Sequence, residues 1–469
     1  MTQSMKQRLT GALMGLVTLG LTACGGGDAT VKGRVSDGAG TQQAQQQVRA
    51  QGELGGSGTV AATSQVRVSS VGAGGALELQ AEVEVEVQAE GRYELSVPAE
   101  QQRLVVQALD ASGQVLASAL LETSGEAGET AVAPPMDSES SLEAEVFLQL
   151  VKDGAQPSST DTVDLRARLD TRVAAEVLKG SAEARAAWVK ALAQGVRAAQ
   201  EAELRTYAEA GVQTSQDALF DAELAAAAKL NAALDAGGSA AQAYETFHAE
   251  LAAAAQRVGA EAHEHAQAES SASAAFRVSL EARLPEQSAE PLVDAAVRAA
   301  ASLEARSSGA ALTALLKAAG AADATQAQAA SAAAQLRTQV DAAGSASAAA
   351  QAFAGFSAAV ATDSRVEATV LGTFLGVNAT NAAGANLAVQ AATTAGATLD
   401  SSLDIAADGA ISVTGLLDVT ALATGTAEAY GSFASGLRNQ ASVLSAFGDK
   451  RTPAMELLIV AEGSFRAGR

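Results

Sequence analysis

Residues 130–150 read TAVAPPMDSESSLEAEVFLQL, and the hydrophobic period of the chain changes within this stretch. Upstream of Pro134 and Pro135, apolar and polar residues alternate, as they do in half-buried β-strands. Downstream, Ser140 and Glu143 have the spacing of a helix capping box. Apolar residues then recur at helical spacing: Leu142, Val146 and Leu150. The sequence therefore predicts an α+β multidomain chain, with an N-terminal antiparallel β-sandwich followed by a larger all-α helical bundle.

The clearest strand pattern lies at residues 77–89, LELQAEVEVEVQA. Its apolar residues are expected to share the inward face: Leu77, Leu79, Ala81, Val83, Val85 and Val87. The opposite face carries acidic residues: Glu78, Glu82, Glu84 and Glu86. These side chains would lie about 7 Å apart, too far to chelate one calcium ion without a loop. We expect a solvated stripe rather than a calcium or cationic-partner site, balanced by outward arginines on neighbouring strands: Arg34, Arg67 and Arg92.

The β-rich segment, 30–135, also contains a hairpin signal, since residues 103–109 and 114–121 flank Asp110-Ala111-Ser112-Gly113. A Gln- and Gly-rich stretch, 39–58, is expected to form a long loop. Three stretches resemble the carboxypeptidase regulatory-like, or transthyretin-like, module: VKGRVSDGAG (31–40), GRYELSVP (91–98) and VVQALDASGQVLASALL (105–121). The resemblance implies a β-sandwich that serves as a non-catalytic accessory or adhesion domain.

Residues 136–160 are expected to form a helical linker, and 161–469 an Ala-rich helical bundle. One apolar stripe closed by Gly180 predicts a helix: Leu165, Leu169, Val173 and Val177. Trp188, Leu192 and Val196 are in line on the next helix, which is expected over 182–210. Further helices are expected over 215–236, 239–258, 260–284 and 289–306.

Charge divides the helical body, because residues 161–306 contain 36 charged side chains while 307–399 contain seven. The stretch 368–399 has none, but its asparagines, glutamine and threonines argue against membrane insertion. We expect the weakly charged helices within 307–399 to lie centrally, covered by the charged ones, or to form a protein interface. A hairpin is expected over 403–413, turning at Asp408-Gly409.

The overall charge excludes some partners. The chain has 53 acidic and 31 basic residues, a formal net charge of −22, so a nucleic acid partner is not expected. Its single cysteine excludes an intrachain disulfide framework and a Cys-cluster metal site.

The first 24 residues have the organisation of a secretory signal. Lys6 and Arg8 precede an uncharged run, 9–23, that is too short to span a bilayer. The run leads into Leu21-Thr22-Ala23-Cys24, which resembles the lipobox of bacterial lipoproteins. The resemblance implies cleavage between Ala23 and Cys24, lipidation of Cys24 and removal of 1–23, with 24–29 as a lipidated tether. The alternative is an ordinary signal peptide or a buried inert thiol.

Further implications follow from this resemblance. Gly25, in place of aspartate, implies sorting to the outer membrane, and the partner is then the membrane itself through the lipid on Cys24. Without Lys6 and Arg8 the mature chain would carry a charge of −24, so an anionic bilayer would repel its body and a cationic surface or envelope protein would attract it.

Motifs for catalysis, cofactors and metals are missing from the sequence. It contains no phosphate-binding loop, dinucleotide fingerprint, nucleophile elbow or H-E-x-x-H string. The histidines are His248, His263 and His265, and the last two would point about 200° apart on a helix. We expect all three to be solvated, with no catalytic, cofactor or metal site.

Three functions are compatible with these patterns. The first is a lipid-anchored envelope protein with a non-catalytic structural, adhesion or protein-interaction role. The second is a carrier that holds a lipid or apolar ligand between the weakly charged helices of 307–399. The third, ranked last, is an enzyme with a carboxylate-based site.

Overall fold

The computed structural model describes residues 27–36, 62–84, 91–99, 103–284, 287–318 and 323–362, with short stretches between 401 and 432. Several features predicted from the sequence lie outside these residues: Ala23 and Cys24, the loop over 39–58, the uncharged stretch 368–399 and most of the hairpin over 403–413.

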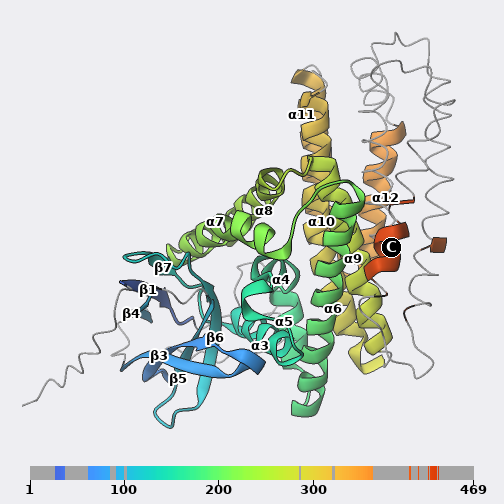
Figure 1. The fold of residues 1–469 in the computed structure, drawn as a ribbon. Coiled ribbons are helices and arrows are strands. Elements are labelled where there is room, and N and C mark those ends of the chain that lie inside the picture. The colour runs from blue at the N-terminus through green and yellow to red at the C-terminus, as the bar shows by residue number, and fades with distance from the viewer. Residues whose placement is uncertain are drawn as a thin grey trace, which may run out of the picture.

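The N-terminal part forms two β-sheets that share one hydrophobic core (Figure 1). One sheet has the strand order β4-β1-β7 and the other β3-β2-β5-β6. The strands are β1 Asp28–Arg34, β2 Gln65–Val71, β3 Leu77–Glu84, β4 Arg92–Pro98, β5 Arg103–Leu109, β6 Val115–Glu122 and β7 Thr130–Val132. The ladders are antiparallel except for the one between β1 and β7, which is parallel. This parallel ladder departs from the expected antiparallel pattern because the chain crosses from β6 of the larger sheet to the smaller sheet, where β7 lies beside β1.

The hairpin predicted around Asp110 is confirmed, since it joins β5 to β6. The Asp110 carboxylate accepts hydrogen bonds from the backbone N–H of Ser112 and of Gln114, and Gly113 has a φ of 82°. β5 is buried on both faces, which explains its nearly continuous apolar sequence. One face packs against the other sheet and the opposite face against the helices.

The inward face predicted for β3 is wrong at its start, because Leu77 and Leu79 are exposed by 36% and 58%. The register of β2 and β3 shifts between Val68 and Ser69, so that Leu79 pairs with Ser69 while Ala81 pairs with Val68. This bulge moves the two leucines away from the face on which Ala81 contacts the sheet core.

The arginines expected to balance the acidic stripe divide into two groups. Arg67 does so, with its Nε 2.9 Å from a Glu82 carboxylate oxygen. Arg34 and Arg92 instead reach the end of helix α7, Gln216–Asp235, where Arg34 donates to the Leu234 carbonyl and Arg92 pairs with Asp235. These two side chains therefore connect the small sheet to the helices.

Ten α-helices lie in the described residues between 138 and 362. They are α3 Ser138–Lys152, α4 Thr162–Arg168, α5 Thr171–Leu178, α6 Ala182–Glu209, α7 Gln216–Asp235, α8 Ala240–Arg257, α9 Ala262–Arg283, α10 Glu290–Ala318, α11 Asp323–Asp341 and α12 Ala346–Thr362. The four helices predicted between 182 and 284 are confirmed to within two residues at each end.

Three helix boundaries differ from the prediction. The cap of α3 is Asp137, whose carboxylate accepts the N–H groups of Glu139 and Ser140, so a capping box at Ser140 and Glu143 is wrong. The stripe that begins at Leu165 is divided between α4 and α5, because Asp170 caps a new helix. Helix α10 continues to Ala318 rather than ending at 306.

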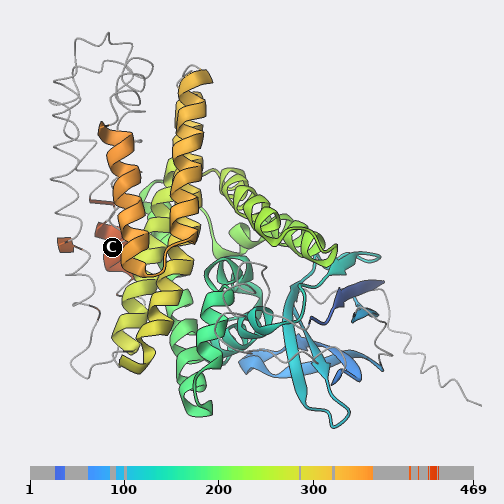
Figure 2. The ribbon, with the colours of Figure 1, turned by 180° about the vertical axis from the view of Figure 1, so that it is seen from behind.

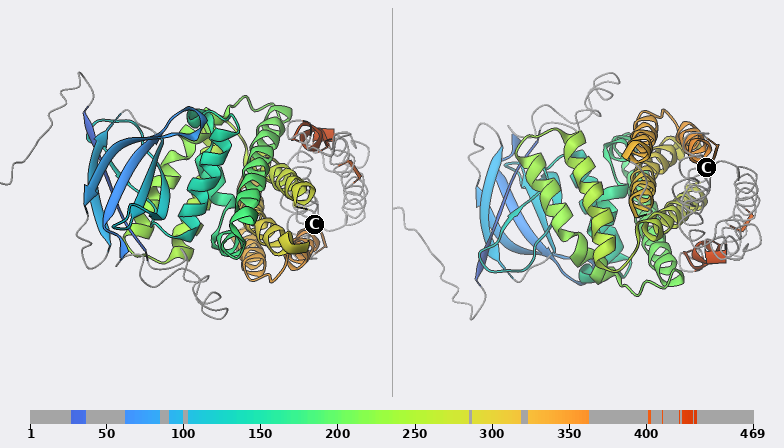
Figure 3. Two further views of the ribbon diagram at one scale, coloured as in Figure 1. Left: turned by 90° about the horizontal axis from the view of Figure 1, so that it is seen from below. Right: turned by 90° about the horizontal axis from the view of Figure 1, so that it is seen from above.

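The helices cover one face of the larger sheet in successive layers (Figures 2 and 3). Helix α3, within the segment expected as a linker, is buried on the sheet through Val146 and Phe147. The long helices α6, α9 and α10 form the next layer, and α11 and α12 lie beyond them. Helices α6 and α9 approach closely at Gly195, where a Cβ would lie 2.9 Å from the Phe276 ring. The core is thus continuous from the sheet into the helices.

Candidate functional site

A group of acidic side chains is buried where α4, α6, α7, α9 and α10 meet. Its carboxyl groups, each on a residue at most 6% exposed, belong to Asp161, Asp164, Glu203, Glu223, Glu269 and Glu304. Among the described residues, one basic side chain forms ion pairs with this group. It is the fully buried Arg168, whose guanidinium lies 3.0 Å from Asp164 and 3.2 Å from Glu269. The group therefore has a large excess of carboxyl groups over cations.

Three members of this region could ligate a metal ion. Glu203 on α6 and His265 and Glu269 on α9 each offer one ligand atom, and these atoms lie within 4.8 Å of one another. His265 and Glu269 are four residues apart and share one face of α9. All three residues are at most 5% exposed. We call these residues the buried triad.

The imidazole of the buried triad is held by a tyrosine from the neighbouring helix. The Tyr207 hydroxyl, four residues after Glu203 on α6, lies 2.8 Å from Nδ1 of His265. Each helix thus contributes two side chains at the spacing of one helical turn, and the close packing of α6 on α9 brings the two pairs together. The contact occupies Nδ1 and leaves Nε2 for another partner.

Burial controls the electrostatics of the triad. Desolvation, aided by the nearby Arg168, lowers the pKa of His265 to about 4, so its imidazole is neutral at neutral pH. Desolvation raises the pKa of Glu269 to about 7, although Arg168 opposes the shift. The pKa of Glu203 is raised well above its usual value, first by burial and then by the charge of Glu269. Both carboxylates are thus costly to ionise unless a cation accompanies them.

Two neighbouring contacts show the same shortage of positive charge. Glu304, which is fully buried, accepts a hydrogen bond from Ser270 through Oε1, while its Oε2 has no hydrogen-bond partner among the described residues. Burial, and then the charge of Asp161, raise the pKa of Glu223 well above its usual value. Neighbouring buried carboxyl groups disfavour each other's ionisation unless a cation accompanies them.

A second buried polar cluster surrounds Arg166. The Arg166 guanidinium reaches Glu143 at 3.2 Å, the Asn231 side chain at 3.2 Å and the Leu120 carbonyl at 3.1 Å. Glu122 lies 3.6 Å away. Because these partners belong to the sheet, α3 and α7, the cluster connects the layers of the fold.

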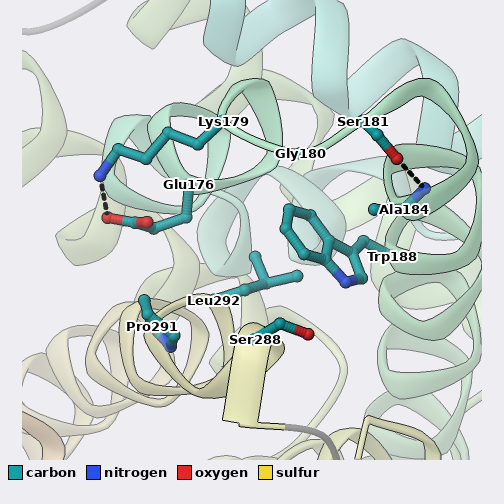
Figure 4. A pocket seen from close by; sticks show the side chains of 9 residues that line it. All are labelled: Glu176, Lys179, Gly180, Ser181, Ala184, Trp188, Ser288, Pro291 and Leu292. Atoms are coloured by element: carbon teal, nitrogen blue, oxygen red, sulfur yellow. Dashed lines mark hydrogen bonds and ion pairs between the residues drawn. The ribbon is translucent and has the colours of Figure 1, made fainter.

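A surface pocket of about 350 Å³ lies where the turn between α5 and α6 meets the start of α10 (Figure 4). Trp188 and Leu292 supply apolar surface, while Glu176 and Lys179 form an ion pair of 2.7 Å at its edge. The Trp188 ring packs so closely on Gly180 that a Cβ there would lie 2.6 Å from it. The lining contains no group of converging titratable side chains apart from this ion pair, so the buried triad is the stronger candidate.

The structure corrects the expectation for the histidines. His265 is 4% exposed rather than solvated. His248 on α8 is partly buried against Phe247, with ring centroids 5.3 Å apart, and burial lowers its pKa well below the usual value. His263 lies on the same helix as His265, as predicted, but its side chain lies outside the described residues.

The sequence contained part of the signal for this site. His265 and Glu269 have the spacing that places two ligands on one helix face. Glu203 extends the stripe of Leu192 and Val196 and therefore occupies a core position. The approach of α6 to α9, which places Glu203 beside this pair, depends on tertiary packing.

Comparison of the chain with protein-family models, with curated proteins and with solved structures finds no match.

Proposed function

We propose that the chain is a lipid-anchored protein of the bacterial outer membrane with a non-catalytic structural, adhesion or protein-interaction role. The observation that carries this proposal is the position of Cys24. It ends the motif Leu21-Thr22-Ala23-Cys24 and stands three residues before Gly27, the first residue that the structure describes. Three residues span at most about 11 Å, so acyl chains on Cys24 would hold the start of β1 close to the bilayer.

The arrangement of layers gives the anchored protein a direction. Strand β1 belongs to the sheet that lies on one side of the molecule, whereas α11 and α12 lie on the other side (Figures 1 and 3). With the lipid at Cys24, the sheets would be nearest the bilayer and the outer helices would be available to a partner. In the described residues, no helix has the length and apolarity needed to cross a membrane.

The burial of the acidic group supports a non-catalytic role over a carboxylate-based enzyme. Glu203 and Glu269 are 5% and 4% exposed, and Glu304 is fully buried. A substrate would have to displace helices to reach these oxygens, whereas general acid–base catalysis requires contact with the reacting atoms.

The carrier alternative needs space between the weakly charged helices. In 307–318 and 323–362 the helices pack through small side chains, and a Cβ on Gly309 of α10 would lie 2.8 Å from the Cβ of Ala333 of α11. This packing leaves little room for a ligand at that contact and favours the interaction role.

Substitution of the cysteine tests the anchor. Cys24→Ser should leave the membrane fraction after cell disruption, and the mass of its N-terminal peptide should lack the acyl groups carried by the unaltered chain. Thr22→Ser is the matched control, because it keeps a small residue in the motif and should remain in the membrane fraction with a lipid on Cys24. Membrane retention of Cys24→Ser, or a wild-type peptide without lipid, would contradict the anchor.

A separate experiment tests the interaction role. Crosslinking in intact cells should repeatedly trap the same envelope partner, and its contact surface should be cationic because the mature chain is strongly acidic. Failure to trap any partner at saturating crosslinker would contradict the interaction role while leaving the anchor unaffected.

A further inference from the structure

We propose that the buried triad of Glu203, His265 and Glu269 binds a divalent transition-metal ion that holds α6 and α9 together. The ligand atoms come from two helices and lie within 4.8 Å of one another. Oxygen and nitrogen ligands of zinc lie about 2.0–2.2 Å from the ion, so small side-chain movements would bring all three atoms into its coordination sphere.

The surrounding charges supply an independent reason for a cation. Arg168 is the one basic side chain that pairs with the acidic group among the described residues, and it is already shared between Asp164 and Glu269. Glu304 hydrogen-bonds to Ser270, the neighbour of Glu269, and its second oxygen is buried without a hydrogen-bond partner among the described residues. A divalent ion would compensate charge that the protein's own basic groups leave uncompensated.

The contact between Tyr207 and His265 has the form of the support that metal ligands receive in proteins. A histidine that binds a metal through one ring nitrogen commonly donates a hydrogen bond through the other, which fixes the orientation of the ring. Here Nδ1 faces the Tyr207 hydroxyl at 2.8 Å. Nε2 is then the nitrogen available to the ion.

The ligand types select the class of ion. Calcium and magnesium prefer sites made of oxygen ligands alone, whereas zinc, manganese and ferrous iron accept imidazole together with carboxylates. The triad offers two carboxylates and one imidazole, so a first-row divalent ion is favoured over the alkaline-earth ions. The ion would join α6 to α9 beyond the point where Gly195 meets Phe276.

Zinc and cobalt are the probes of choice. The full chain, extracted in detergent and treated with a chelator, should bind one Zn²⁺ per chain by elemental analysis and native mass spectrometry, with a raised melting temperature. An excess of Ca²⁺ should not displace the zinc. Co²⁺ should produce the visible absorption of a cobalt ion bound to nitrogen and oxygen. Because the site is buried, the ion is added both to the folded chain and during refolding.

Matched variants locate the site. His265→Gln and Glu269→Gln should each weaken zinc binding by at least about 100-fold, whereas His248→Gln, which alters a partly buried histidine outside the triad, should bind as the wild type. Tyr207→Phe keeps every ligand and should weaken binding by about 10–100-fold.

Each possible result is informative. A folded wild type that binds neither Zn²⁺ nor Co²⁺ at millimolar concentration overturns the proposal, as does unchanged binding by His265→Gln. Weaker binding by His248→Gln instead would place the ion elsewhere and overturn it too. If circular dichroism shows that a ligand variant does not fold, the zinc affinity of Tyr207→Phe and the cobalt spectrum of the wild type test the proposal in its place. None of these results depends on the lipid anchor.

Discussion

The Tyr207 hydroxyl on α6 lies 2.8 Å from Nδ1 of His265 on α9, and both residues are at most 4% exposed. This contact crosses the pair of helices with the most extensive contact in the described structure, at one turn from the carboxylates Glu203 and Glu269. A polar contact in such a place is costly to break, because water cannot replace the lost partner.

Removal of this hydroxyl should therefore destabilise the metal-free protein. Tyr207→Phe leaves a buried ring nitrogen without a partner and should lower the free energy of unfolding by about 1–3 kcal/mol, measured by urea denaturation. Tyr93→Phe is the control. Tyr93 is 6% exposed and its hydroxyl has no hydrogen-bond partner among the described residues, so its loss should be neutral or stabilising. Equal losses in both variants would contradict a role for the contact.

The buried guanidinium of Arg168 should contribute strongly to stability. Arg168→Met removes the partner of Asp164 and Glu269 and should lower the free energy of unfolding by about 3–5 kcal/mol, because it leaves buried carboxylates without compensation. Arg197→Met removes a partly exposed pair with Glu201 and should change the free energy of unfolding by less than about 1 kcal/mol. Chemical denaturation of the variants beside the wild type measures both, and similar losses would contradict the assignment.

The close approach of α6 and α9 should make Gly195 sensitive to a single methyl group. Although alanine is the better helix former, Gly195→Ala places a Cβ 2.9 Å from the Phe276 ring and should cost about 1–3 kcal/mol of stability. Gly344→Ala is the matched control, because a Cβ there meets no atom within 4 Å and the backbone is not in the left-handed region. Thermal unfolding compares them, and a stabilised Gly195→Ala would show that the helices are further apart.

The cap of α3 should make stability depend on pH. Burial raises the pKa of Asp137 from 3.8 to about 6, so the folded chain holds this proton more tightly than the unfolded chain. Its contribution to stability is complete below about pH 4 and is lost as the pH rises through about 6, a loss of up to about 3 kcal/mol. Asp137→Asn still caps the helix but does not ionise, so its stability relative to the wild type should increase between pH 4 and 7.

An aspartate with the opposite shift provides the control for this pH experiment. Hydrogen bonds from Ser112 and Gln114 lower the pKa of the exposed Asp110. The wild type should therefore gain stability relative to Asp110→Asn as the pH rises from the folded pKa of Asp110 to about 4, where the unfolded carboxyl is also ionised. Urea denaturation at several pH values measures both differences. The same direction in both variants would contradict the assignment.

Features governed by neighbours in the chain were predictable. Helices α6 and α7 begin where Ser181 and Ser215 cap their N-termini. Asp110 stabilises the hairpin turn through the backbone N–H groups two and four residues further along the chain. Predictions failed where a local signal competed with another. Asp137 outcompetes Ser140 as the cap of α3, and the bulge opposite Ser69 overrides the alternation that placed Leu79 inside.

The site shows the same division. His265 and Glu269 were visible as a pair four residues apart, but the three histidines were expected to be solvated because nothing in the sequence placed a tyrosine and a glutamate against them. Similarly, Arg34 and Arg92 were expected to balance the acidic stripe of residues 77–89 from neighbouring strands. In the structure they instead contact Leu234 and Asp235 at the end of α7.

By itself, the sequence determined the order of strands and helices, most helix ends and the spacing of His265 and Glu269 along one helix face, because these depend on interactions within about four residues. Only the tertiary structure decided that Glu203 and Tyr207 meet that face and that Arg168 is the basic side chain paired with it. The physical reason is burial. The charges of these side chains interact strongly once the packing of five helices excludes water, and no local sequence pattern specifies which residues will share the buried space.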